Sequence, residues 1–230
     1  FSQRGIKKIY TDMKKEVVIF GVKDTAELAW WYLTHDSEYT VVAFTVHRAY
    51  MEINSFHDLP VVPFEDLLQH YSPDQYFLFA PMTGVKMNTL RRDVYLMGKS
   101  MGYSYISYIS SKATVCGNSI GENCFILEDN TIQPFTTIGN NVVMWSGNHI
   151  GHHGKIEDHV FFTSHVVLSG HCHVKERAWF GVNATIRDYS TIGEGCLISM
   201  GALITKSTED GSFYMGMPAK KQEKLAIEVY

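Results

Sequence analysis

Histidines gather in one stretch of this 230-residue chain. Seven of the eleven fall between residues 149 and 173, namely His149, His152, His153, His159, His165, His171 and His173. A neutral imidazole can take a proton from an attacking amine or hydroxyl near pH 7. Three imidazoles that converge on one point can instead hold a metal ion. The stretch is therefore a candidate for general-base or metal chemistry, and the ordinary alternative is a set of surface or interface histidines.

An apolar residue recurs every six residues through the same part of the chain. The positions are Ile120, Ile126, Ile132, Ile138, Met144, Ile150, Ile156, Phe162, Leu168, Val174, Phe180, Ile186, Ile192, Ile198 and Ile204. Small residues, including Cys124, Cys172 and Cys196, stand two positions earlier in the repeat. Because a strand alternates sides with a period of two, two inward positions in every six predict a short strand followed by a turn. Three such units close one coil, so residues 111–207 are predicted to form a parallel β-helix in which residues eighteen apart stack.

The histidines all avoid the inward positions of this coil. His152 and His153 follow the inward Ile150, so they are expected on a turn at an edge of the β-helix, where a ligand or a neighbouring subunit can reach them. His153 and His171 are eighteen apart and are expected to lie one above the other. A metal site needs a third converging imidazole, which the spacing alone does not supply. We therefore expect no metal, and a general base at the edge is the leading functional hypothesis.

Strands alternate with helices before the coil. Apolar runs predict strands at 17–21, 40–46, 59–62, 76–80 and 103–109, and helical spacing predicts helices at 24–33, 64–70 and 85–101. Asp24 or Thr25 is the expected N-cap of the first helix. The alternation predicts a small Rossmann-like α/β domain with a parallel sheet over residues 13–110. Such sheets bind ligands at the carboxyl ends of their strands, so Gly21, Asp24, Thr25 and His47 are candidate substrate-binding residues, although an ordinary strand-to-helix turn would explain them equally well.

Composition narrows the classes of function. Lys and Arg number 20 against 24 for Asp and Glu, a near-neutral balance that argues against a nucleic-acid-binding protein. No run approaches the roughly 18 apolar residues of a membrane span, and no secretory leader is recognisable, so we expect a cytoplasmic protein without a membrane partner. Cysteines at inward positions fit a reducing compartment.

Met13 resembles a natural start, and residues 1–12 are given no function. Residues 208–230 form a tail that is expected to cover the last coil, because an exposed sheet edge needs a cover.

Four motifs give the chain a resemblance to a known family. They are Asn148-His149-Ile150-Gly151-His152-His153, Ser169-Gly170, Phe180-Gly181-Val182-Asn183-Ala184 and Gly216-Met217-Pro218-Ala219-Lys220. With these motifs, residues 15–221 resemble the bacterial sugar O- and N-acetyltransferases, which include sialic acid O-acetyltransferases and the N-acetyltransferases of the bacillosamine and perosamine pathways. The resemblance implies a left-handed β-helix of hexapeptide repeats and a homotrimer. It also implies acetyl-CoA in the groove between two adjacent β-helices and a sugar held beside the N-terminal domain.

The resemblance also implies roles for single residues. On the family pattern His152 takes the place of the catalytic base, and Gly170 matches the glycine whose backbone N–H faces the acetyl oxygen and stabilises the oxyanion. Gly181 is implied to lie on the CoA wall. Lys220 and Lys221 resemble tail residues near the adenosine end, where cations suit phosphates, so the tail is expected to contact CoA.

Two positions depart from the family pattern. His153 stands where an acidic neighbour often raises the basicity of the base, so either Glu157 or Asp158 helps or the base is weaker. The loop at 21–26 lacks the glycine-rich sequence usual for a nucleotide-linked sugar, which leaves the carrier nucleotide open. Because an amine needs a weaker base than a hydroxyl, we expect N-acetylation, by direct attack, of an amino group on a nucleotide-linked deoxy sugar for a surface glycan. A sugar O-acetyltransferase, a zinc enzyme of the carbonic anhydrase type, which uses the same coil, and a non-catalytic trimeric scaffold are the alternatives.

Overall fold

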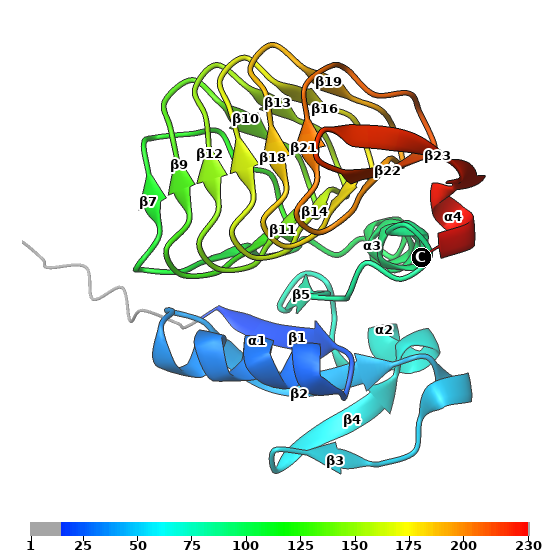
Figure 1. Ribbon diagram of the computed structural model, residues 1–230. Coiled ribbons are helices and arrows are strands. Elements are labelled where there is room, and N and C mark those ends of the chain that lie inside the picture. Colours follow the sequence, from blue (N-terminus) through cyan, green and yellow to red (C-terminus); the bar gives the residue numbers. More distant parts are fainter. Residues whose placement is uncertain (1–14, 230) are drawn as a thin grey trace, which may run out of the picture.

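The structure, a computed structural model, describes residues 15–229, so the expected start at Met13 and residues 1–12 lie outside it. An N-terminal lobe is followed by a β-helix and a C-terminal tail (Figure 1). The lobe contains a five-stranded sheet of order β3-β4-β2-β1-β5, parallel except for β3. Its strands are β1 (Glu16–Phe20), β2 (Thr40–Val46), β3 (Ser55–Phe56), β4 (Leu59–Pro63) and β5 (Phe77–Phe79). Its helices are α1 (Asp24–His35), α2 (Leu67–His70) and α3 (Thr89–Ser100), with 3₁₀ turns η1 (Arg48–Tyr50) and η2 (Phe64–Asp66).

Alternation along β1 divides the lobe into two apolar cores. Val17 and Ile19 point to the face covered by α1, whereas Val18 and Phe20 point to the face covered by α2 and α3. The first core also takes in Phe125, an outward residue of the β-helix. Burial of each such side chain stabilises the fold by roughly 1.5–3 kcal/mol, so the lobe and the β-helix are held together by a shared core.

The structure corrects the expected end of the α/β sheet. The strand expected at 103–109 is instead β6 (Tyr108–Ile109), which pairs with β8 (Phe125–Ile126) and so begins the β-helix. Tyr105 makes only an isolated bridge with Leu78 of the lobe sheet. The aromatic and aliphatic residues of this segment could form a strand in the lobe sheet or in the β-helix, and packing between segments far apart in the sequence decides between the two sheets.

Two helix starts also differ from expectation. The first N-cap is Lys23, with no side-chain capping bond, rather than Asp24 or Thr25. Helix α3 begins at Thr89 rather than at residue 85, because the preceding residues 86–88 all have positive φ values, which an α-helix does not admit. The β3–β4 hairpin was not foreseen, and its turn residues His57 and Asp58 also have positive φ.

Three sheets, parallel except for the tail strand β23, form the walls of the β-helix, and the largest of them includes the tail strands β22 (Ser212–Gly216) and β23 (Ala219–Leu225) (Figure 1). Their orders are β10-β13-β16-β19, β21-β18-β15-β12-β9-β7 and β23-β22-β20-β17-β14-β11-β8-β6. The remaining strands of the coil are β7 (Thr114–Val115), β9 (Thr131–Ile132), β10 (Thr137–Ile138), β11 (Val143–Met144), β12 (His149–Ile150), β13 (Lys155–Ile156), β14 (Phe161–Phe162), β15 (Val167–Leu168), β16 (His173–Val174), β17 (Trp179–Phe180), β18 (Thr185–Ile186), β19 (Thr191–Ile192), β20 (Leu197–Ile198) and β21 (Leu203–Ile204). Strands eighteen residues apart pair in register, so the predicted repeat is confirmed.

The inward positions form one continuous core. Each apolar position of the repeat from Ile126 to Ile204 is at most 4% exposed, and Ile120 packs against the same cluster while partly buried. Phe162 stacks on Phe180 with a centroid separation of 4.5 Å and an interplanar angle of 1°. Residues eighteen apart therefore stack as the repeat predicts.

A residue with positive φ turns the chain at each edge of the β-helix. The first edge has Asn123, Asn141, His159, Arg177 and Gly195; the second has Asp129, Gly147, His165, Asn183 and Gly201; the third has Gly117, Phe135, His153, His171 and Tyr189. Asn, Asp, His and Gly, the residues that tolerate this conformation best, supply most of these positions. Each edge is thus a column whose side chains face outward, available for contacts.

The first edge holds the N-terminal lobe. Arg91 of α3 is fully buried, and its guanidinium Nη1 donates to the His159 carbonyl at 2.9 Å while Nη2 donates to the carbonyl and the side-chain Oδ1 of Asn141. Asn123 Oδ1 accepts a hydrogen bond of 2.8 Å from the Ala80 N–H at the end of β5. Burial lowers the pKa of Arg91 to about 9, so the side chain remains charged at neutral pH. Two coils of one edge therefore position α3.

His159 is held neutral in this interface. Burial, reinforced by the positive charge of Arg91, lowers the pKa of His159 from 6.5 to about 4. The Asn141 amide lies 2.9 Å from His159 Nδ1, which accepts the hydrogen bond because Asn141 Oδ1 already faces Arg91. If the His159 ring were protonated, its Nδ1–H and the Asn141 side-chain amide would be two donors facing each other.

Acidification is expected to weaken the fold through His159. The unfolded chain takes up this proton near pH 6.5 and the folded chain only near pH 4, so the free energy of unfolding falls by up to about 3 kcal/mol as the pH drops through this window. Urea titrations at pH 7.5 and 4.5 measure the loss. His159→Asn, whose side chain suits an edge position with positive φ, should show a smaller loss over the same range. Equal losses in both proteins would assign the pH dependence to carboxylates instead.

The tail lies against the last coil. Strand β22 (Ser212–Gly216) pairs in parallel with β20, and β23 (Ala219–Leu225) pairs antiparallel with β22, followed by α4 (Ala226–Val229). Tyr214 packs against the inward core. The tail therefore extends the largest sheet beyond the last coil.

No helix among residues 15–229 is long and apolar enough to cross a membrane.

Candidate active site

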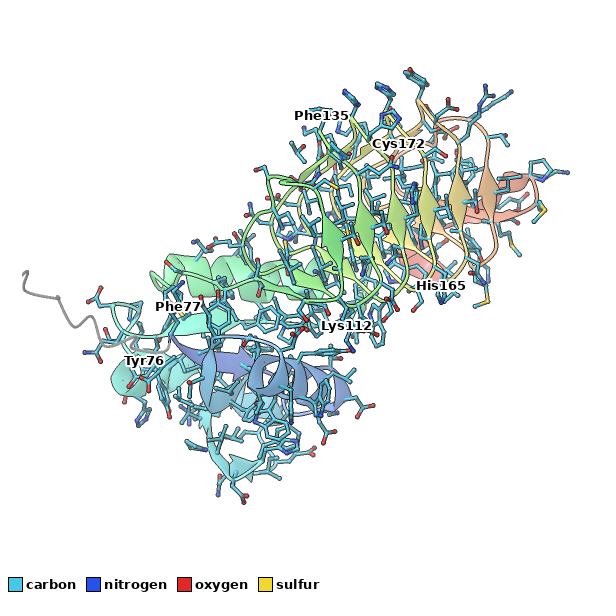
Figure 2. All side chains as sticks on the ribbon, turned by 90° about the vertical axis from the view of Figure 1, so that its left-hand side faces the viewer. Tyr76, Phe77, Lys112, Phe135, His165 and Cys172 are labelled. Atoms are coloured by element: carbon cyan, nitrogen blue, oxygen red, sulfur yellow. The ribbon has the colours of Figure 1, made fainter. Side chains whose placement is uncertain are left out.

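The third edge carries a column of four aromatic rings. Phe135 lies 4.7 Å from His153, His153 lies 5.0 Å from His171, and His171 lies 4.5 Å from Tyr189, measured between ring centroids. The two histidine rings are nearly parallel, at 16°, and His171 is parallel to Tyr189 within 4°. Phe135 and Tyr189 are 74% and 71% exposed. Figure 2 shows Phe135 at the edge of the β-helix far from Tyr76 and Phe77 of the lobe.

His152 stands beside this column. Its ring is perpendicular to those of His153 and His171, with centroids 5.1 Å from each. Its Nδ1 lies 2.9 Å from Nδ1 of His153, so one imidazole donates a hydrogen bond to the other. Its backbone N–H donates to Gln133 Oε1 at 3.1 Å. When His152 is the donor, its Nε2 carries the free lone pair that a general base needs. The two residues expected to be catalytic thus lie in direct contact.

Gly170 lies against the His152 ring. A Cβ added to Gly170 would lie 2.8 Å from His152 Cε1 and 3.0 Å from Nε2. A Cβ on Gly151 would in turn lie 2.5 Å from the Gly170 nitrogen. Among residues 15–229 the Gly170 N–H donates no hydrogen bond, so it is free to meet an oxygen of a bound ligand. His152 and Gly170, to which the family resemblance gives roles in the same reaction, therefore lie next to each other in the structure.

Three imidazoles converge where the spacing placed only two. One potential ligand atom from each of His152, His153 and His171 lies within 4.8 Å of the others. The spacing had predicted the stacked pair alone. His152 completes the group because its ring turns toward the column, an orientation that no repeat distance encodes.

The other histidines of the cluster lie apart from this group. His159 is buried on the first edge, His165 is exposed on the second, and His173 is 2.7 Å from Glu157 Oε1. Glu157, expected as a possible acidic helper of the base, thus binds His173, and Asp158 Oδ1 accepts from the Asn140 backbone N–H. Neither carboxylate contacts His152 in the described chain.

Apart from Gly170, the expected CoA-binding residues lie elsewhere on the coil and tail. Gly181 follows β17, and a Cβ there would meet the backbone of Met200 on the next coil. Lys220 and Lys221 lie in β23, exposed, and Lys221 pairs with Glu209. None of the three contacts His152 within the described residues.

The lobe contains a cavity at the carboxyl ends of β1 and β2. It has a volume of about 640 Å³, and Gly21, Thr25 and His47 line it, whereas Asp24 does not. His47 Nδ1 is 3.0 Å from Glu65 Oε1, which fixes the ring at the rim. The sequence did not predict that α3 forms a wall of this cavity, to which Leu90, Asp93, Val94 and Met97 contribute. The rule for parallel sheets finds the strand ends, but a helix that folds back from later in the chain leaves no such local signal.

Comparisons with known proteins agree with this architecture. Residues 119–152 match the family described as bacterial transferase hexapeptide (six repeats). Two curated acyl-(acyl-carrier-protein)–UDP-N-acetylglucosamine O-acyltransferases are similar over part of the chain: that of Sinorhizobium fredii is 28% identical over 86 residues, 34% of this chain, and that of Pseudomonas paraeruginosa is 31% identical over 85 residues, 37% of this chain. These matches span 32% and 33% of the two relatives, about a third of their length.

Solved structures match over most of the chain. A histidine-to-asparagine variant of perosamine N-acetyltransferase from Caulobacter crescentus, bound to CoA and GDP-perosamine, has a TM-score of 0.82 at 22% identity and covers 91% of this chain and 97% of its own. The acetyltransferase domain of PglB from Neisseria gonorrhoeae, with acetyl coenzyme A, has a TM-score of 0.80 at 21% identity and covers 91% and 100%. WeeI from Acinetobacter baumannii has a TM-score of 0.77 at 18% identity and covers 90% and 100%. At these identities the likeness establishes the fold, an α/β lobe followed by a left-handed β-helix of hexapeptide repeats.

Proposed function

We propose that this hexapeptide-repeat, left-handed β-helix protein is an acetyl-CoA-dependent N-acetyltransferase. Its acceptor is an amino group of a nucleotide-linked deoxy sugar for a surface glycan. The contact between His152, His153 and Gly170 is the observation that carries the proposal, because it brings an imidazole that can act as a base next to a free backbone donor. The similar perosamine enzyme, bound to CoA and GDP-perosamine, supports the choice of donor and acceptor.

The reaction is direct transfer. The sugar amine attacks the thioester carbonyl carbon while His152 Nε2 takes its proton, and the carbonyl becomes an oxyanion that the Gly170 N–H stabilises. The C–S bond then breaks, the amide forms, and the proton passes from His152 to the CoA sulfur. His153 Nδ1 accepts a hydrogen bond from the Nδ1–H of His152 and so keeps the ring oriented. A neutral acceptor supports the imidazolium less than a carboxylate would, which suits an amine better than a hydroxyl.

The cysteines support a route without an acyl-enzyme. Burial raises the pKa of the Cys124 thiol to about 11 and that of Cys196 to about 12, and it also raises the pKa of Cys172. Thiols of this kind stay protonated and inert at neutral pH. Cys116 is exposed before the first full coil and contacts no residue of the candidate site in the described chain.

The substrates are assigned to separate parts of the molecule. The sugar lies in the lobe cavity, where Gly21, Thr25 and His47 meet it; the apolar side chains of α3 on the same wall suit the methyl group of a deoxy sugar. Asp24 does not line this cavity and is not part of the proposed sugar site. CoA lies along the coil near Gly170 and Gly181, with Lys220 and Lys221 of the tail near its phosphates.

The proposed enzyme is a homotrimer, and the placement of these parts supports such an assembly. The cavity belongs to the lobe, which docks on the first edge, whereas His152 stands at the third edge. One chain therefore does not bring the proposed base to its own cavity, and in the proposed trimer a neighbouring copy does so. A cytoplasmic location, where such a donor is available, is part of the same proposal.

A thiol-release assay with acetyl-CoA tests the function. Nucleotide-linked amino sugars are compared with the matching hydroxyl sugars, and free CoA is expected only with the amino sugars. Release with the hydroxyl sugars alone would replace the proposal by O-acetylation. Release with neither class would favour the scaffold alternative.

Gly170→Ala is expected to impair acetyl transfer. The new methyl group would occupy the space of the His152 ring and displace it, and misplacement of a catalytic group by about 1 Å can cost about 10²-fold in rate. The kcat of the purified variant measures the effect. Gly195→Ala, on the first edge, is the control: its added Cβ meets open space, so the variant should keep its rate, while its positive φ lowers the stability of the fold by about 1–2 kcal/mol. A normal rate in Gly170→Ala would show that His152 needs no such fit.

A further inference from the structure

We propose that His152, His153 and His171 form a binding site for a transition-metal ion of the zinc type, and that the bound ion inhibits the enzyme. The three side chains each present one potential ligand atom within 4.8 Å of the others. Binding of the ion stands on this geometry alone. Inhibition rests on the proposed function, because it requires His152 to be the base.

The edge holds two of the three ligands in place before any ion arrives. His153 and His171 are stacked between Phe135 and Tyr189, with centroid separations of 4.5–5.0 Å along the column. Their backbones are fixed by hydrogen bonds to the previous coil, from His153 N–H to the Pro134 carbonyl and from His171 N–H to the His152 carbonyl. Ordering two rings in advance lowers the entropy lost on binding.

The ligand chemistry selects the ion. Imidazole nitrogens suit zinc, copper and nickel, whereas magnesium and calcium prefer oxygen. Two nitrogens at 2.0–2.1 Å from a tetrahedral zinc ion are about 3.3 Å apart, a spacing that falls between the 2.9 Å separating the Nδ1 atoms of His152 and His153 and the 4.8 Å limit for all three ligand atoms. All three side chains are exposed, so small rotations, chiefly of His152 beside the column, complete the geometry. Three protein ligands leave the fourth position to solvent.

The site is suited to reversible binding. Within residues 15–229 no carboxylate forms an ion pair with any of these three rings, whereas such partners typically raise metal affinity about 10–100-fold. The ion is therefore exchangeable and adds nothing to the β-helix core. It inhibits because coordination by His152 uses the lone pair that would otherwise accept the amine proton.

Cobalt and zinc titrations of the metal-free full-length protein test the site. We expect one ion per chain, seen as visible Co²⁺ absorption that Zn²⁺ abolishes. His171→Phe keeps a ring in the column, as Phe135 does at the same edge, but removes one ligand and should weaken binding by about tenfold or more. His171→Asn, which tolerates positive φ, should behave in the same way. His165→Asn, an exposed histidine of the second edge, should bind as the wild type does.

Activity provides the second measurement. Zinc should inhibit acetyl transfer by the wild type and spare His171→Phe, when the rate of each protein with zinc is compared with its own rate without metal. Equal zinc affinity in the wild type and in both His171 variants would overturn the site. Activity that needs zinc would overturn the inhibitory role. Zinc binding in a protein that transfers no acetyl group would uphold the site and refute the proposed function separately.

Discussion

Replacing His152 by alanine is expected to lower the rate of acetyl transfer about 10²–10⁴-fold, the loss typical of a missing general base. The ring that contacts both His153 and Gly170 would be gone, while the coil backbone would be unchanged. The effect should fall on kcat, because the base acts in the transition state and not in the binding of acetyl-CoA. Steady-state kinetics with acetyl-CoA and the preferred amino sugar measure it.

The matched control is His173→Ala. This histidine also faces outward on the coil but pairs with Glu157, away from the aromatic column. Its rate should stay near that of the wild type. Added imidazole should partly restore the His152→Ala variant, because the lost side chain was exposed and left an open space. An undiminished rate in His152→Ala would transfer the role of base to His153 or to the substrate itself.

Arg91→Ala is expected to lower the free energy of unfolding by about 3–5 kcal/mol. The guanidinium is fully buried and donates to carbonyl groups on two coils, at Asn141 and His159. Its removal leaves these acceptors buried without a donor and opens a cavity beside Phe161, whose ring lies 5.6 Å from the guanidinium. Urea denaturation followed by circular dichroism and by tryptophan fluorescence measures the loss.

The neighbouring Arg92 provides the control for this loss. It lies on the same helix, is partly exposed and pairs with Asp93 at 2.8 Å. A surface pair of this kind contributes about 0–1 kcal/mol, so Arg92→Ala should change stability little. Arg91→Lys keeps the charge but cannot span two carbonyls, and should fall between the two. A loss below about 1 kcal/mol in Arg91→Ala would show that the shared apolar core, not Arg91, joins the lobe to the β-helix.

Much of the candidate site followed from local pattern. The six-residue repeat put Ile150 inside and therefore put His152 and His153 at an edge, and the eighteen-residue period stacked His153 on His171. The strand ends of the lobe were also found, since Gly21 and His47 line the cavity as expected. The turns with positive φ also have a signal in the sequence, because Asn, Asp, His or Gly stands three residues after many of the inward positions.

The amino-acid sequence alone determined the β-helix, its inward core and the edge on which the histidines lie. These follow from the alternation of a strand and from a short repeat, both of which act between residues close in the chain. Only the tertiary structure decided the turn of the His152 ring into the column, the docking of Arg91 on Asn141 and His159, and the transfer of Tyr108 from the lobe sheet to the coil. Each of these features depends on packing between segments that are far apart in the sequence. A local sequence pattern contains no information on such long-range contacts, so it cannot select one arrangement over another.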